Sequence, residues 1–423
     1  MKNSFEINHH LSPTKTTTHM KLKSTLLFSV IILAAGNASA VTRVFNITGA
    51  TAFRASANQA IISVLGGGTT KYAYIGTKGV AGTDRAIFVG TMAAFPGDTI
   101  IVRASWSGST QGIKDCEDNA SIQFLDDNVI TGVISGDPAT NGNPVTTTGY
   151  NLGGAGNEAP EYENAIAQWS FSDVDKLLSD RPNATFAGGP VGVVPFMFLA
   201  GEGSPATITN MTDQLHRALW KTGELPSAFF TGNTADATPV LATGRNNGSG
   251  TRATILAETG YGAFTGVTQY GATFEGTASE PYPTAKLTGV TEFANGGNSS
   301  NSGVRDILTR SSQDLGCYFV SYLTISDALA AITEGAKEMT YNGVHFSTEN
   351  VKKGLYSLWG YQQFYRDNDA SAEEITFDTA FRTAIPATLT EPNAIPIPNM
   401  SVLRTAGDGG PIAPGSAYPA ANP

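Results

Sequence analysis

Short apolar runs alternate with short runs of glycine and hydroxyl residues along most of the chain. Residues 43–47 alternate between polar and apolar side chains, as a half-buried strand does. The run at residues 191–200 is continuously apolar and predicts a central, fully buried strand. The strands predicted in this way are residues 43–47, 100–104, 165–171, 191–200, 239–242 and 316–323.

Helices are predicted between these strands. The segment at residues 209–212 is expected to cap one that buries Leu215, Ala218, Leu219 and Trp220. Residues 355–365 carry aromatic side chains at helical spacing, which is typical of core packing. Strands joined to helices by turns of small residues indicate an α/β protein. The predicted helices are residues 52–62, 174–178, 213–220, 253–258 and 325–336.

Three turns between a strand and a helix share one pattern of glycine and hydroxyl residues. They are Gly49-Ala50-Thr51, the segment at residues 105–114, and Arg245-Asn246-Asn247-Gly248-Ser249-Gly250-Thr251. We expect Thr51 to cap the first helix, and Ser249 or Thr251 to cap the last. Backbone N–H groups at a helix start attract anions, and Arg245 could close such a site with its charged fork. The alternative is that these are ordinary capped junctions.

Asp173 follows the strand at residues 165–171, at a position where ligands bind in α/β sheets, although aspartate there also commonly caps a helix. Nothing in the sequence predicts catalysis. G-x-S-x-G and G-x-x-x-x-G-K-[ST] motifs are absent, and only His216 and His345 lie beyond residue 40. His216 is expected at the surface, on the flank of its helix. Without C-x-x-C or H-x-x-x-H spacing, no metal or cofactor is predicted.

Residues 1–40 have the features of a secretory signal peptide with an extended N-terminus. A basic segment at residues 20–23 precedes an apolar run at residues 25–35, and Ala38-Ser39-Ala40 provides a small-x-small cleavage site. The run is too short to span a bilayer. We therefore expect a periplasmic or secreted protein.

The net charge of the chain excludes some classes of binding partner. The whole chain has 26 basic and 36 acidic residues. Four of the basic residues and one of the acidic residues lie in residues 1–40, so the rest of the chain has a net charge of −13. Such a surface argues against nucleic acid and anionic membranes as partners. A local nest of N–H groups can still bind a small anion.

Several segments carry weaker expectations. Cys116 and Cys317 form one disulfide or remain two buried thiols. Residues 116–163 are predicted to be a long surface excursion, and residues 295–303 a flexible tip. Beyond residue 385, the proline- and glycine-rich tail is expected to wrap the surface or be partly disordered.

Taken in order, these loops resemble those of the phosphate-binding protein of bacterial ABC uptake systems, a type II periplasmic binding protein. Gly49-Ala50-Thr51 with Phe53, Gly108-Ser109-Thr110-Gln111-Gly112, Ser172-Asp173 and residues 245–251 match four ligand loops of that family. The resemblance spans most of residues 41–366. It implies a two-lobed fold, each lobe a sheet flanked by helices, with residues 41–189 and 346–423 in lobe one and 190–345 in lobe two.

The resemblance also implies a ligand and a set of contacts. The implied ligand-binding residues are Thr51, Phe53, Ser109, Asp173, Arg245, Asn247, Ser249, Gly250 and Thr251. Arg245 would form a bidentate salt link, and Asp173 would accept a hydrogen bond from a protonated oxyanion and so reject sulfate. The chain departs from the family at Asn247, where an acid is usual, and in the long insertion before Asp173.

The first hypothesis is an exported binding protein that captures inorganic phosphate, or a related oxyanion such as arsenate or molybdate, between its lobes. Its partner would be an ABC permease, and we expect a monomer that is not an enzyme. The second hypothesis is a structural or cell-surface module that has lost or changed its ligand. Hydrolysis of phosphate esters is disfavoured, since no nucleophile and base are paired in the sequence.

Overall fold

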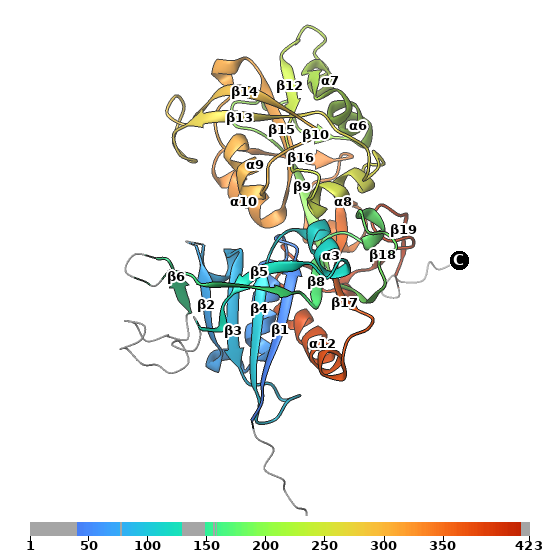
Figure 1. The fold of residues 1–423 in the computed structure, drawn as a ribbon. Coiled ribbons are helices and arrows are strands. Elements are labelled where there is room, and N and C mark those ends of the chain that lie inside the picture. The colour runs from blue at the N-terminus through green and yellow to red at the C-terminus, as the bar shows by residue number, and fades with distance from the viewer. Residues whose placement is uncertain (1–39, 77, 129–148, 155–156, 158, 416–423) are drawn as a thin grey trace, which may run out of the picture. The chain divides into compact units, whose positions relative to one another are not determined.

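The structure is a computed structural model that describes residues 40–76, 78–128, 149–154, 157 and 159–415 (Figure 1). The predicted signal peptide lies outside the described residues, apart from Ala40. Across the described ranges, no helix has the length and apolar character needed to cross a membrane.

The predicted α/β class is confirmed, because a large mixed sheet is flanked by helices (Figure 1). In spatial order its strands are β11 (Glu224–Pro226), β12 (Pro239–Ala242), β15 (Tyr318–Thr324), β9 (Phe186–Ala200), β17 (Trp359–Asp367), β8 (Trp169–Ser172), β1 (Thr42–Gly49), β4 (Thr99–Ser105), β3 (Arg85–Gly90), β2 (Lys71–Ile75) and β6 (Tyr150–Leu152), with β16 (Lys337–Tyr341) beside β9 and β10 (Asn210–Met211) beside β16.

Helices follow all three predicted strand-to-helix turns, and further helices form elsewhere in the described chain. They are α1 (Arg54–Val64), α2 (Gly79–Gly82), α3 (Ser109–Glu117), α6 (Asp213–Thr222), α7 (Ala228–Thr231), α8 (Gly250–Glu258), α9 (Asn301–Leu308), α10 (Ile325–Thr333), α11 (Thr348–Lys352) and α12 (Ala372–Ala384). Three two-stranded sheets complete the described fold: β5 (Ser121–Leu125) with β7 (Tyr162–Ile166), β13 (Gln269–Glu275) with β14 (Lys286–Ala294), and β18 (Val402–Arg404) with β19 (Ile412–Pro414).

Strand β9 joins the two halves of the large sheet. Its first part pairs antiparallel with β17, up to Pro195, and its last part pairs with β15 from Phe196 to Ala200. The side chains from Val193 to Ala200 are all buried, so the continuously apolar run predicted a central strand correctly. The predicted boundary between lobes, after residue 189, falls within β9, and the division into lobes stays a prediction.

Parallel strands bring several loops to the same edges of the sheet. β1 runs parallel to both β4 and β8, and β12 runs parallel to β15. The loops that follow β1, β4 and β8 therefore leave one edge together, as do those that follow β12 and β15. In open α/β sheets, ligands bind at such carboxyl ends.

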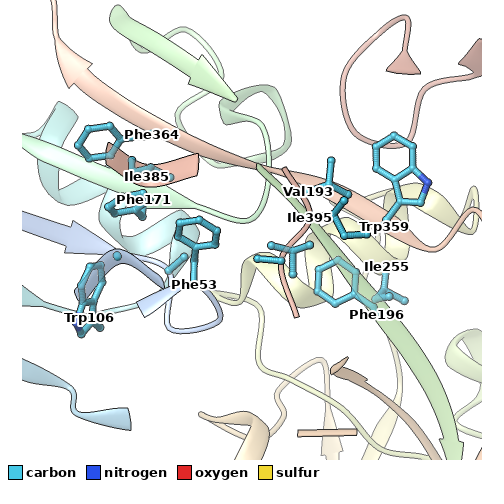
Figure 2. Packing of buried hydrophobic residues seen from close by; sticks show 14 of the residues in the cluster. Phe53, Trp106, Phe171, Val193, Phe196, Ile255, Trp359, Phe364, Ile385 and Ile395 are labelled. Carbon is cyan, nitrogen blue, oxygen red and sulfur yellow. The ribbon is translucent and has the colours of Figure 1, made fainter. Parts of the chain in front are cut away.

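An aromatic core fixes the first three of these loops (Figure 2). Phe171 of β8 stacks on Phe364 of β17 with ring centroids 4.4 Å apart, and it also packs against Phe53 and Trp106. Trp106 directly follows β4, and Phe53 ends the short loop between β1 and α1, so the core holds the backbone of both loops.

A prediction about the second half of the chain was wrong. Residues 295–303 were expected to be a flexible tip, but Asn298 forms backbone hydrogen bonds to Gly244 and Asn246, and α9 begins at Asn301. The aromatic run at residues 355–365 contributes to the core as predicted, and from Trp359 onward it forms strand β17. The described part of the tail, residues 386–415, lies on the surface for most of its length, with Ile395 fully buried and Asp408 6% exposed.

Two predictions about the first half also need correction. The excursion at residues 116–163 contains β5, β6 and β7, of which β6 extends the large sheet beside β2. The run at residues 165–171 is divided between β7 and β8. After Asp173 there is only a 3-10 turn, Lys176–Leu178, and its cap is Asp175. Of the two alternatives for the cysteines, the structure has the buried free thiols.

Candidate functional site

The loop after β12 ends in the helix start that its sequence predicts. Ser249 is the N-cap of α8, and its hydroxyl accepts a hydrogen bond from the N–H of Arg252 at 3.3 Å. Thr251, in the first turn, donates its hydroxyl to Oδ2 of Asp173 at 3.1 Å. Two of the predicted loops, which are far apart in the sequence, therefore meet here.

Asp173 is the buried centre of this meeting, with 1% of its surface exposed. Its N–H donates to the hydroxyl of Ser109 at 3.3 Å, while its Oδ1 has no hydrogen-bond partner among the described residues. Burial raises the pKa of Asp173, and the hydroxyl of Thr251 and the charge of Arg245 oppose that rise.

Gly250 lets the loops touch directly. A Cβ atom at this position would lie 2.0 Å from Oδ1 of Asp173 and 2.4 Å from Oγ of Ser109. A further contact joins the same loops, since the hydroxyl of Thr110 donates to the carbonyl oxygen of Gly248 at 2.7 Å. The starts of α3 and α8 are thus in contact, with Asp173 between them.

Arg245 is buried but has no acidic partner. It is 4% exposed, and no carboxylate lies within 4.0 Å of it among the described residues. Its Nη1 donates to Oδ1 of Asn301 at 2.7 Å and its Nη2 to the carbonyl oxygen of Ser299 at 3.0 Å, while Nε has no partner there. Burial lowers the pKa of Arg245, opposed by the more distant charges of Asp173 and Asp327.

A cavity of about 720 Å³ adjoins Arg245. Its walls come from the ends of β1, β4, β12 and β15 and from the segment before α9. At α9 the hydroxyl of Ser300 caps the helix by accepting from the N–H of Gly303. The lining residues are Thr51, Arg54, Ile75, Gly76, Lys78, Gly82, Asp84, Trp106, Ser107, Gly108, Gln111, Arg245, Asn246, Gly248, Ser299, Ser300, Asn301, Ser302 and Asp327.

The predicted ligand residues fall into two groups. Thr51 and Arg245 line this cavity, whereas Ser109, Asp173, Ser249, Gly250 and Thr251 form the contact beside it and do not line it. Thr51 does not cap α1 as expected, since Phe53 is the N-cap and makes no side-chain cap bond. The Phe53 side chain is buried in the core, and Phe53 does not line the cavity.

Asn247 lies on the other side of the loop. It is exposed and lines a second cavity of about 370 Å³, together with Lys114, Arg252 and Phe264. The residue that departs from the family pattern is therefore not a partner of Arg245 in this structure. The hydrogen-bond partners of Arg245 are Asn301 and Ser299 instead.

Sequence reasoning missed Arg54, Trp106 and residues 299–302 as walls of the cavity. The Ser-Ser-Asn-Ser run at residues 299–302 does carry a helix-cap signal, which would have placed the start of α9. Trp106 gave no such signal, because only the fold brings it to the cavity.

His216 is also not where it was expected. It is fully buried, stacked on Trp220 with ring centroids 4.4 Å apart, and its ring nitrogens have no partner among the described residues. Burial lowers its pKa to about 3, so the ring is neutral. Within the described ranges, no group of three or more His, Cys, Asp or Glu residues could hold a metal ion.

Comparison with known proteins gives similarity in structure alone. No protein-family model matches the sequence, and no curated protein sequence matches it significantly. Among solved structures, the chain is similar to a protein from Clostridium perfringens described as a phosphate ABC transporter substrate-binding protein, solved with bound phosphate. The identity is 11% and the TM-score 0.48, over 84% of this chain and 100% of that one.

Two further similar structures are of the same kind. An ABC-type phosphate transport receptor from Vibrio cholerae is 12% identical, with a TM-score of 0.42 over 80% of this chain and 93% of that one. The high-affinity periplasmic phosphate-binding protein PfluDING is 13% identical, with a TM-score of 0.44 over 84% and 91%. These belong to the family that the loops resemble. Because the similarity is this distant, the case for function rests on the residues of the chain itself.

Proposed function

We propose that this protein is an exported substrate-binding protein that holds an oxyanion of the phosphate type in the cavity beside Arg245. The observation that carries the proposal is the buried guanidinium of Arg245, which has no carboxylate within 4.0 Å among the described residues. A buried charge without a counter-charge is costly, and an oxyanion on its open side removes that cost.

The surrounding donors suit the same ligand. The starts of α3 and α9 border the cavity, at Gly108 and at Ser300, and helix starts present backbone N–H groups and a partial positive charge. The hydroxyl of Thr51 and the remaining N–H groups of the Arg245 guanidinium add donors whose hydrogen bonds to an anion are charge-assisted.

Asp173 has a place in the proposal as a selector. Its Oδ1 is buried against Gly250 and has no partner among the described residues, so it would reach a ligand only after Thr251 and Asp173 separate. A carboxylate there would then accept a hydrogen bond only from an anion that carries a proton. Phosphate has such a proton near neutral pH and sulfate has none. Ligand entry between Thr251 and Asp173 would be coupled to closure of the two sheet halves around β9. Delivery to an ABC permease, as a monomer, completes the proposal.

Isothermal titration calorimetry with phosphate and with sulfate tests the binding. We expect heat with phosphate, little with sulfate, and loss of the phosphate signal in Arg245→Gln. Arg217→Gln is the matched control, because Arg217 lies on α6, outside the cavity, and donates to the carbonyl oxygen of Thr259 at 3.0 Å. No heat at millimolar phosphate, with the protein shown to be folded by circular dichroism, would refute the proposal.

A second candidate is a structural module with the same fold and no ligand. It is favoured by one observation: Ser109, Asp173 and Thr251 bond to one another, and both terminal nitrogens of Arg245 already have partners. In that case Arg245→Gln changes neither small-molecule binding nor growth on scarce phosphate. A p-nitrophenyl phosphate assay tests the hydrolase alternative, and we expect no turnover.

A further inference from the structure

The cavity contains acidic groups that suit a larger ligand than free phosphate. Asp84 and Asp327 both line it. Asp84 pairs with Arg54 at 2.5 Å, and Asp327 accepts from the hydroxyl of Thr324 at 3.2 Å. Two carboxylates repel a bare anion, but each accepts hydrogen bonds from hydroxyl groups. The charge of the wall is thus mixed: Arg54, Lys78 and Arg245 are cations, and Asp84 and Asp327 are acceptors.

Two residues on different walls of the same cavity each carry a donor that has no partner among the described residues. The donors are Nε of Arg245, in the loop after β12, and Nε1 of Trp106, in the loop after β4. Both residues are 4% exposed, and the two donor atoms themselves are buried. Buried donors normally have partners, so a small movement of either side chain toward a ligand with acceptors on both walls would satisfy them.

The volume agrees with this requirement. At about 720 Å³, the cavity lies in the range of about 300–1,000 Å³ typical of sites for small organic molecules. A single tetrahedral anion on Arg245 would leave most of this space, and the wall formed by Trp106 and Asp84, without contacts.

We propose that the cavity takes a phosphate monoester of a polyol, such as a sugar phosphate. The phosphoryl oxygens would lie on Arg245 and the start of α9, and the hydroxyls would donate to Asp84 and Asp327. An oxygen of the polyol body would accept from the indole N–H of Trp106. This inference rests on the proposed oxyanion function, and it names the ligand class of the same site.

Calorimetry on the purified protein compares glucose 6-phosphate and glycerol 3-phosphate with inorganic phosphate, gluconate and glucose. We expect at least one ester to bind tenfold or more tightly than phosphate, since each charge-assisted hydrogen bond contributes about tenfold in affinity. Glucose is expected to give no heat, because it lacks the anion.

Asp84→Asn should affect the affinities for ester and for phosphate differently, because it removes a negative charge and the ion-pair partner of Arg54. We expect ester binding to weaken by about tenfold and phosphate binding to strengthen or stay the same. The side chain of Asp84 is 69% exposed, so the variant should fold. Asp369→Asn makes the same charge change at an exposed position outside the cavity and is the control.

Each outcome decides between the two proposals. Phosphate binding as tightly as the esters overturns the ester class and leaves the oxyanion function standing. Gluconate binding more tightly than the esters also overturns the ester class, in favour of a sugar acid. Glucose binding as well as its phosphate, or no binding by any compound, overturns both. Equal weakening of phosphate and ester binding in Asp84→Asn overturns the assigned role of Asp84.

Discussion

Replacing Gly250 by alanine tests whether the two loops meet as the structure has them. The added Cβ would lie 2.0 Å from Oδ1 of Asp173 and 2.4 Å from Oγ of Ser109. These atoms are buried and belong to short side chains on two other loops, so they have little room to give way. The start of α8 must move away from Asp173, and the bond from Thr251 must lengthen or break.

The expected cost follows from that overlap. Overpacking by one methyl group costs about 1–3 kcal/mol in a tight core. Alanine is a better helix former than glycine by up to about 1 kcal/mol, which offsets part of the cost at this first position of α8. We expect the free energy of unfolding of Gly250→Ala to fall by about 1–2 kcal/mol, and phosphate binding to weaken with it.

Gly248→Ala, two residues earlier in the same loop, is the matched control for stability. The nearest atom to its added Cβ is Oδ1 of Asn246 at 4.0 Å, which is ordinary contact. Urea denaturation of both variants and the wild type, followed by circular dichroism, measures the difference. If Gly250→Ala is as stable as Gly248→Ala, the contact between Asp173, Ser109 and α8 is absent, and the reasoning about the site fails.

Three further predictions concern buried groups. Burial lowers the pKa of His216 from 6.5 to about 3, so between these pH values the unfolded chain binds a proton at this ring and the folded protein does not. The free energy of unfolding should therefore drop by about 3 kcal/mol between pH 6.5 and pH 4. Denaturation at both pH values should show a smaller drop in His216→Phe. Arg404→Met removes the ion-pair partner of the buried Glu258, 2.5 Å away, and leaves that carboxyl group without a counter-charge. The free energy of unfolding should fall by about 3–5 kcal/mol in the same assay. Adding Glu258→Leu should restore much of the lost stability. Cys116 and Cys317 are buried thiols with raised pKa values, so a thiol reagent should label neither cysteine in the native protein. After unfolding without reductant, the reagent should label both. Failure to label the unfolded protein would indicate a disulfide.

The elements that could be predicted from the sequence are those whose local pattern survives in the fold. β9 is buried on both faces and therefore reads as one apolar run. The start of α8 was predictable because Ser249 and the glycines carry a local capping signal. In both cases, residues close together in the sequence determine the structure.

The failures depend on contacts between distant residues. β17 was not predicted as a strand, because residues such as Trp359 and Phe364 are buried, and burial on both faces removes the alternation that marks a strand. His216 is polar, and only its stacking on Trp220 places it in the core. Parts of the cavity wall were missed for the same reason, since the order of strands in the sheet decides which loops share an edge.

The partners of Arg245 give the most informative difference between sequence and structure. The resemblance places an acid of its family at the position of Asn247, but in this structure Asn247 is exposed and lines a different cavity from Arg245. The partners of Arg245 are the neutral side chain of Asn301 and the carbonyl of Ser299. These acceptors fix the orientation of the guanidinium, and no carboxylate lies within 4.0 Å of it among the described residues. The residue at position 247 therefore does not decide whether Arg245 is neutralised, and the case for an anion ligand rests on the buried, oriented arginine itself.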